Sequence, residues 1–357
     1  SHNPAEYNGM KVSRENALPV GLDTGLGQIK EWIESGRECV PAAVRGSVHQ
    51  MDIKADYLEF LLKYKGDWSS LKIAMDVSNG MASLFVRDIF GDQPAYIYEE
   101  MDGRFPNHEP NPLVQRNVED LKKLVAETGA DIGVIFDGDA DRVMFVDENS
   151  RFISPDLMIA VLGHYFLEER GEKGYIHQDI RSSKAVGEYL APMGGVMNTW
   201  RVGRAYAALK LREIDGVYGG ELAGHYYFRD FFYSDSGLLA AILIINVVAK
   251  MKAQGVSLSQ LIARIEKYQN SGEINFRLED KKGAMDAVRD YFTASEQSTA
   301  YMDFDGYRVE FPDWWFNIRP SNTEPYLRFL CEATSQELLE EKVAKVREIL
   351  TERFGAK

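Results

Sequence analysis

The chain has 357 residues, of which 45% are hydrophobic and 27% are charged, and its formal net charge is −14. This length exceeds one ordinary domain, so we expect several domains with enough apolar material for separate cores. An acidic surface repels nucleic acid and anionic membranes, which excludes both as expected partners.

Two further features concern the compartment. Cys39 and Cys331 have no near neighbour in the sequence, so we expect reduced thiols rather than a disulfide framework. No signal peptide opens the chain, and the most apolar run (237–249) is shorter than the about 20 residues of a membrane span. We therefore expect a cytoplasmic protein without a membrane partner, either a monomer or a homodimer.

Helical and strand patterns alternate along the first three quarters of the chain, which favours α/β layers. Ser154 and Pro155 supply a capping serine and a first-turn proline for one of the helices. In chain order, we expect helix 26–35, strand 71–77, helix 113–128, strands 131–136 and 143–146, helix 157–167, strand 174–177, helices 183–190 and 205–212, a strand–loop–strand at 217–228, and a buried helix from 237.

A change of composition at 270–273 predicts a linker before a last structural unit. Thr334 and Glu337 form a predicted capping box for the long helix that closes this unit. Before that helix we expect strand 274–278, helix 284–292, and strands 306–311, 314–318 and 326–333.

Three aspartates directly follow a predicted buried strand, in a segment that we name the aspartate loop (137–142). If the loop continues the strand, side-chain alternation places Asp137, Asp139 and Asp141 on one side. Oxygen ligands suit Mg²⁺, and α/β sheets bind ligands at the carboxyl ends of their strands. An EF-hand has this spacing, but Arg142 occupies the position where that loop needs glycine. A plain acidic turn stays open as the alternative.

The arginine loop (319–325) offers the inventory that binds a dianionic phosphate: arginine, hydroxyl, amide and backbone N–H groups. An ordinary capped turn explains it equally well. The glutamate loop (219–225) holds Glu221, whose carboxylate can bind vicinal sugar hydroxyls, or it is a charged surface loop. The opening segment (1–11), taken alone, is a polar loop with one serine and one lysine.

In this order, the four segments resemble the α-D-phosphohexomutase family. SHNPAEYNGMK resembles the family's active-site serine loop, DGDADR its metal loop, GGELAGH its sugar loop and RPSNTEP its phosphate loop. The resemblance covers the whole chain, and the stretch GGELAGHYYFRDF is most similar to bacterial members.

The resemblance implies a role for each matched residue. Ser1 would carry the transferred phosphoryl group, with His2 and Lys11 beside it, and Lys11 would be a general acid/base near other cations. One Mg²⁺ would be held by Asp137, Asp139, Asp141 and a phosphate oxygen on Ser1. Arg142 would neighbour the transferring group. The substrate-binding residues would be Arg181, Arg204, Glu221, His225, Arg319, Ser321, Asn322 and Thr323.

The fold implied is a multidomain α/β architecture with mixed sheets and a C-terminal α+β domain similar to the TATA-binding protein. The implied units are the remainder of domain 1 (1–46), domain 2 (47–150), domain 3 (151–268) and domain 4 (269–357). The implied activity is that of an isomerase, a phosphomannomutase or phosphoglucomutase. It would interconvert hexose 1-phosphate and hexose 6-phosphate through a phosphoserine and a hexose 1,6-bisphosphate, with the phosphohexose as its partner.

The sequence departs from the family pattern in three places. Ala223 stands where a serine is frequent, Arg204 stands where histidine is common, and most of domain 1 would precede Ser1 in family members. Alternative functions are therefore a phosphoglucosamine mutase and an inactive binding protein that retains the fold. A haloacid-dehalogenase-type phosphatase would need a nucleophilic aspartate in a DxDGT/V-like motif, and we find none.

Overall fold

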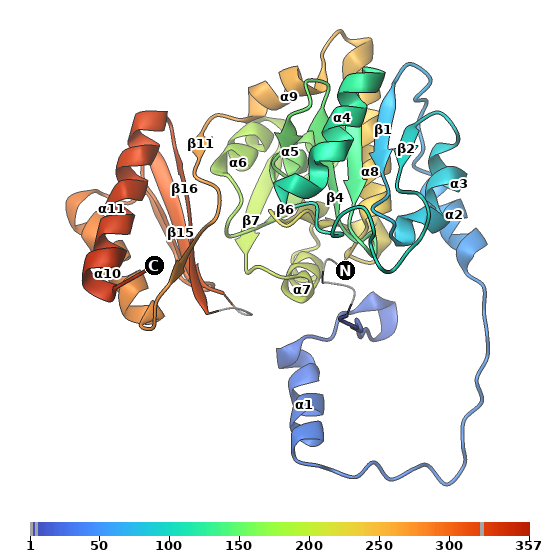
Figure 1. Cartoon of the computed structure of the whole chain (residues 1–357), viewed down its shortest axis with the longest axis horizontal. Helices are drawn as coiled ribbons and strands as arrows, with labels where there is room; N and C mark the ends of the chain where they lie inside the picture. Colours follow the sequence, from blue (N-terminus) through green and yellow to red (C-terminus); the bar gives the residue numbers. More distant parts are fainter. Residues whose placement is uncertain (1–2, 4–5, 322–324) are drawn as a thin grey trace.

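The computed structural model describes residues 3, 6–321 and 325–357. These residues form three β-sheets in chain order, with helices packed on each (Figure 1). Four predicted site residues, Ser1, His2, Asn322 and Thr323, lie outside the described residues.

The first sheet has the strand order β2-β1-β3-β4-β5. Its strands β1, β3 and β4 are buried at every position, as expected for strands covered on both faces. β2 and β3 run parallel to β1, whereas β4 and β5 join antiparallel, so the sheet is mixed. The elements are α2 (Lys54–Leu62), β1 (Ile73–Asp76), α3 (Val86–Phe90), β2 (Ala95–Ile97), α4 (Glu119–Thr128), β3 (Ile132–Phe136), β4 (Val143–Asp147) and β5 (Phe152–Ile153).

The second sheet has the order β10-β9-β8-β6-β7 and is also mixed. β7 and β8 run parallel to β6, and β9 returns antiparallel beside β8. Its elements are α5 (Leu157–Gly163), β6 (Gly174–Asp179), α6 (Lys184–Leu190), β7 (Gly195–Trp200), α7 (Arg204–Glu213), β8 (Tyr218–Gly220), β9 (Tyr226–Phe228) and β10 (Ser234–Asp235).

Helix α8 (Gly237–Ala253) joins the first two sheets into one core. It packs against β3 and β4 of the first sheet and against α5 of the second. Its apolar residues surround it on all sides because it is enclosed by protein. Among the described helices, no single one is long and apolar enough to cross a membrane. α8 and α9 (Leu258–Ile265) would pass such a test only as a pair, which is bent by 102°.

The third sheet forms a separate unit with its own hydrophobic core. All its strands pair antiparallel, in the order β11-β16-β15-β14-β13, and β12 also pairs with β16. The unit confirms the predicted α+β domain at the C-terminal end, drawn in orange and red in Figure 1. Its elements are β11 (Gln269–Asn270), β12 (Ile274–Arg277), α10 (Lys281–Ser295), β13 (Ala300–Met302), β14 (Tyr307–Glu310), β15 (Trp314–Pro320), β16 (Tyr326–Ala333) and α11 (Gln336–Phe354).

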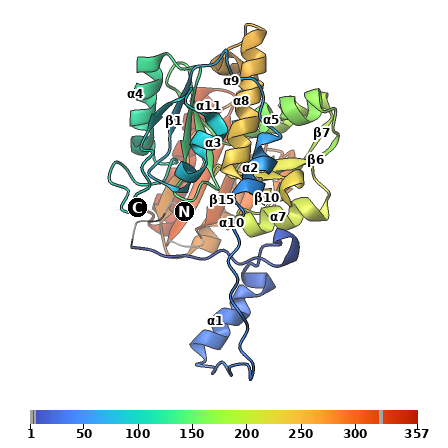
Figure 2. The same ribbon diagram turned by 90° about the vertical axis from the view of Figure 1, so that its right-hand side faces the viewer.

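The N-terminal part of the chain is attached to α7. The Tyr206 hydroxyl donates a 3.1 Å hydrogen bond to Asp23, and the Arg212 guanidinium donates a 2.8 Å hydrogen bond to the Asn16 carbonyl. Helix α1 (Leu26–Glu34) then projects away from the sheets in both views, and an irregular stretch returns the chain to α2 (Figures 1 and 2).

Most predicted elements are present, but two predicted helix caps were wrong. Helix α5 is capped by Asp156, which accepts the Leu157 N–H, whereas Ser154 instead donates to Asp156. Helix α11 is capped by Ser335 rather than by the predicted Thr334. The predicted helix 113–128 consists of a 3₁₀ helix at Gln115–Val118 followed by α4. The first residue of the predicted linker 270–273 is the last residue of β11. The helices and strands that were not predicted are α2, α3, α9, β2, β5, β7, β10, β11 and β13.

Candidate functional site

The aspartate loop is the turn between β3 and β4. Ala140 takes a left-handed backbone conformation with φ of 60°, so the loop turns back instead of continuing the strand. The turn brings carboxylate oxygens of Asp137, Asp139 and Asp141 within 4.8 Å of one another. The predicted cluster is therefore confirmed, although its predicted cause, strand alternation, was wrong. Oδ1 of Asp141 is buried and accepts no hydrogen bond from the described residues, so this set of oxygens fits a divalent cation.

The pKa values of Asp137 and Asp141 in this loop are shifted in opposite directions. Burial raises the pKa of Asp137, and the neighbouring Asp141 carboxylate raises it further. Burial also opposes ionisation of Asp141, but His225, Lys11 and Arg142 outweigh it and lower the pKa of Asp141. A cation among these oxygens would favour the ionised form of each carboxyl group.

Lys11 brings the opening segment to the aspartate loop. Its ammonium nitrogen lies 2.8 Å from Oδ2 of Asp139 and forms a second ion pair with Asp141. Lys11 thus pairs with two carboxylates of the aspartate loop. The contact spans 128 residues of sequence and joins two of the four predicted site segments.

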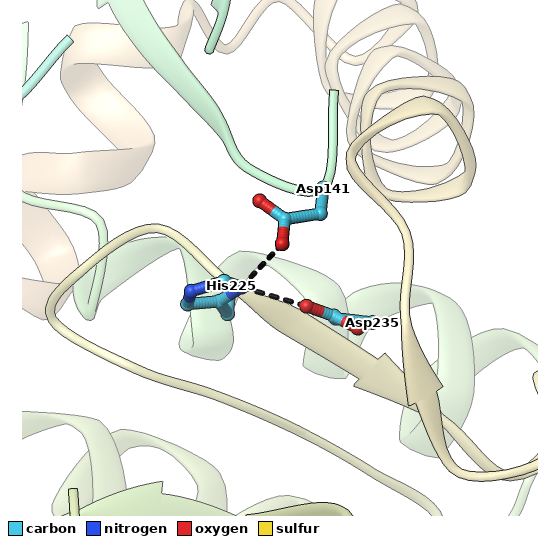
Figure 3. A group of neighbouring side chains, drawn as sticks. All are labelled: Asp141, His225 and Asp235. Carbon is cyan, nitrogen blue, oxygen red and sulfur yellow. Dashed lines mark hydrogen bonds and ion pairs between the residues drawn. The ribbon is translucent and has the colours of Figure 1, made fainter. Parts of the chain in front are cut away.

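Arg142 and His225 join the aspartate loop to the glutamate loop. Nε of Arg142 donates a 3.0 Å hydrogen bond to Nε2 of His225. Since Nε2 accepts, the His225 proton is on Nδ1, which donates a 2.8 Å hydrogen bond to Asp235. Figure 3 shows the His225 ring between Asp235 and Asp141, with Nδ1 3.9 Å from Asp141. On the far side of Asp235, Nε of Arg204 donates a 2.7 Å hydrogen bond to the same carboxylate.

Glu221 lies in the turn between β8 and β9 and is 1% exposed. Its backbone N–H donates to the His225 carbonyl over 2.9 Å, which closes the loop. Its carboxylate accepts a 2.6 Å hydrogen bond from the Tyr227 hydroxyl. Burial raises the pKa of Glu221, and the nearby Asp179 carboxylate raises it further.

Arg181 is buried, and its guanidinium pairs with a neighbouring carboxylate at the end of β6. Its Nη2 lies 2.9 Å from Oδ2 of Asp179. The same Asp179 oxygen accepts a 2.8 Å hydrogen bond from the Leu222 N–H in the glutamate loop. On its other side, Nη1 of Arg181 lies 3.9 Å from Glu273, at the start of the third unit. Arg181 therefore connects the glutamate loop to that unit.

Arg319 lies at the end of β15 and is 3% exposed. Its guanidinium pairs with Oδ1 of Asp305 over 3.1 Å, and Oδ2 of Asp305 accepts a 2.8 Å hydrogen bond from the Val202 N–H. The chain can pass this close to Arg319 because residue 306 is glycine: a Cβ on Gly306 would lie 2.4 Å from the Arg319 Cβ. Ser321 donates its backbone N–H to Tyr326 across the loop.

The described site residues therefore divide into one connected cluster and two arginines that lie outside it. Lys11, the aspartate loop, Arg142, His225 and Arg204 form one continuous cluster of contacts. Arg319 of the third unit connects to the second unit through Asp305, and Arg181 of the second unit contacts Glu273 of the third.

Sequence reasoning missed four groups that hold the predicted residues in place: Tyr227, Asp235, Asp179 and Asp305. No local pattern marks Tyr227, Asp235 or Asp305. Asp179 offered the clearest signal, since it directly precedes Ile180-Arg181 at the carboxyl end of a predicted strand.

Family models of three successive domains match the chain. Their descriptions are phosphoglucomutase/phosphomannomutase alpha/beta/alpha domain II at residues 55–150, alpha/beta/alpha domain III at 154–268, and the C-terminal domain at 273–349.

Similar proteins extend this match to nearly the whole chain. A "Phosphohexose mutases" protein of Xanthomonas campestris pv. campestris is 37% identical over 98% of this chain and 78% of its own length. A phosphomannomutase of Salmonella montevideo is 36% identical with the same coverage. The crystal structure of a phosphoglucomutase/phosphomannomutase family protein from Burkholderia thailandensis has a TM-score of 0.83 and 28% identity, covering 98% of this chain and 74% of that one.

Proposed function

This chain belongs to the phosphoglucomutase/phosphomannomutase family of isomerases, and we propose that it interconverts hexose 1-phosphates and hexose 6-phosphates through a phosphoserine and a hexose 1,6-bisphosphate. One observation carries the proposal: charged groups from three distant segments meet in one bonded cluster. Lys11 contacts Asp139 over 2.8 Å, and Arg142 contacts His225 over 3.0 Å.

In the proposed reaction, the bond between phosphorus and the Ser1 oxygen breaks while a new bond forms to a free hydroxyl of the hexose phosphate. The bisphosphate then turns over within the site, and its other phosphoryl group returns to Ser1. Such transfers depend on positioning and on neutralising charge, which suits this cluster. Lys11 is the proposed carrier of the hydroxyl proton, and it must leave its ion pairs with the aspartates to act.

Asp137, Asp139 and Asp141 are the proposed holders of Mg²⁺, and Ser1 would add a phosphate oxygen. When bound there, Mg²⁺ neutralises charge on the phosphoryl group. Arg142 supplies positive charge beside the same site, and Asp235 fixes His225, which in turn orients the Arg142 side chain.

The proposed substrate contacts divide between two ends of the hexose phosphate. Glu221 would accept hydrogen bonds from sugar hydroxyls, with His225 and Arg204 beside it. Arg319, Ser321, Asn322 and Thr323 would bind the phosphate that is not being transferred. Because this binding group recognises phosphate rather than one face of the sugar, it serves both orientations of the bisphosphate.

The test is a side-by-side assay of mannose 1-phosphate, glucose 1-phosphate and glucosamine 1-phosphate, with Mg²⁺ and hexose 1,6-bisphosphate added. Preferred turnover of glucosamine 1-phosphate would identify a phosphoglucosamine mutase instead, and absence of turnover would favour an inactive binding protein. Ser1→Ala should abolish turnover and the phosphate ester detected by intact mass. Ser13→Ala, a change at an exposed serine just after the opening segment, is the matched control.

A further inference from the structure

The hydroxyl of Tyr227 makes a short hydrogen bond inside the glutamate loop. It donates to Oε1 of Glu221 over 2.6 Å, and both side chains are almost completely buried. This is the one hydrogen bond received by the Glu221 carboxyl group from the described residues. A neutral donor on one oxygen fixes the rotation of the carboxyl group and directs its other oxygen away from the tyrosine.

The position of Tyr227 is itself fixed by packing. Its ring lies on β9, opposite Gly219 of β8, and packs with Ala207, Ala208 and Leu211 of α7. The His225 ring stacks beside it, with centroids 6.1 Å apart. The hydroxyl therefore approaches Glu221 from a rigid base rather than from a flexible side chain.

The backbone of the same loop has a second anchor. The Leu222 N–H donates a 2.8 Å hydrogen bond to Asp179, whose carboxylate is held in turn by Arg181. The loop is thus fixed at two points: its backbone by Asp179 and the Glu221 carboxylate by Tyr227. A carboxylate held in this way is pre-organised to accept hydrogen bonds in one direction.

The hydrogen bond also bears on the charge of Glu221. Burial raises the pKa of Glu221 and Asp179 adds to this, whereas the Tyr227 hydroxyl and Arg181 lower it. A phenolic O–H that donates to the carboxylate stabilises its ionised form. Without that donor, the buried group would retain its proton to higher pH and would accept hydroxyl hydrogen bonds less well.

We propose that Tyr227 is a positioning residue that orients the Glu221 carboxylate, and keeps it an acceptor, for the hydroxyl groups of the hexose. The inference rests on the proposed function, in which Glu221 contacts the sugar. Tyr227 acts through Glu221 and does not touch the phosphate groups.

The test variant is Tyr227→Phe, which removes one oxygen and keeps the ring. The control variant is Tyr226→Phe on the same strand: Tyr226 is equally buried, and its hydroxyl donates over 2.9 Å to the Pro155 carbonyl. Both changes remove one buried hydrogen bond, so a structural effect alone should appear in both. Thermal unfolding of each variant checks that the fold is kept.

The readouts are kcat, KM and the pH profile of kcat/KM with glucose 1-phosphate. Tyr227→Phe should lower kcat/KM by about tenfold, the usual effect of losing one hydrogen bond to a charged group. It should also move the acidic limb of the profile to higher pH, whereas Tyr226→Phe should leave that limb in place. An unmoved limb together with kcat/KM within about twofold of the unmodified enzyme would overturn the inference.

Glu221→Gln separates this inference from the proposed function on which it rests. If Glu221→Gln lowers kcat/KM and Tyr227→Phe does not, only the positioning role fails. If Glu221→Gln leaves kcat/KM unchanged, the assignment of Glu221 to the sugar fails, and the role of Tyr227 fails with it. Absence of turnover by the unmodified protein on every hexose phosphate tested would overturn both.

Discussion

Glu332 links the third sheet to the second α/β unit and provides a quantitative test of that interface. It lies on β16 and is 4% exposed. Its carboxylate accepts hydrogen bonds from Ser183 over 2.7 Å, from Trp315 over 2.8 Å and from Asn270 over 2.9 Å. Ser183 caps α6 of the second unit, so this one carboxyl group bridges two units.

Burial, with the charge of nearby Asp156, raises the pKa of Glu332 from its ordinary value of 4.5 to about 7. The folded state therefore binds the proton more tightly than the unfolded state. The stabilising contribution of this group is fully present below pH 4.5 and is lost as pH rises through about 7. The rise in pKa corresponds to ~3 kcal/mol, which is an upper value for the loss of unfolding free energy between these pH values.

Glu332→Gln removes the titration and keeps the size and one acceptor oxygen. We expect the variant and the unmodified protein to unfold at similar urea concentrations at pH 5. At pH 8 the variant should be the more stable, by up to ~3 kcal/mol. Urea unfolding followed by tryptophan fluorescence measures this, because Trp315 contacts the carboxylate directly.

The exposed Glu340 on α11 offers a control, since Glu340→Gln should follow the unmodified protein at both pH values. If the stability of Glu332→Gln and of the unmodified protein changes in parallel from pH 5 to pH 8, Glu332 is ionised throughout this range. The account of burial at the interface would then be refuted.

Three other predictions concern the site and the core. Asp139→Asn should lower turnover by about 10²-fold or more and raise the Mg²⁺ concentration needed for activity. The exposed change Asp92→Asn should have neither effect. Equal Mg²⁺ requirements of Asp139→Asn and the unmodified protein would contradict the assignment of Asp139 as a metal ligand. Arg319→Ala should raise KM by about tenfold or more because a charge-assisted phosphate contact is lost, and an unchanged KM in steady-state assays would argue against it. Trp314→Ala should cost about 3–5 kcal/mol in denaturant unfolding, because the indole is 2% exposed in the core of the third unit.

The sequence by itself determined most elements of the fold and the residue types of the site. Residues 132–136 and 143–146 are continuous apolar runs, and this pattern is local, so it can be predicted from neighbouring residues. The aspartate loop and Arg319 were recognisable because their chemistry depends on residue types at short spacing. The short strands β2 and β13 lack such a pattern, since edge strands are held by their partners rather than by their own alternation.

Only the tertiary structure decided which groups meet. Lys11 pairs with Asp139 across 128 residues, and Asp305 bridges Arg319 to Val202 across two units. These contacts depend on strand order and on the docking of separate units, which no local spacing encodes. The conformation of the aspartate loop has the same origin. The backbone turns at Ala140 because β4 must return antiparallel beside β3, and this return, not alternation along a strand, brings the three carboxylates together.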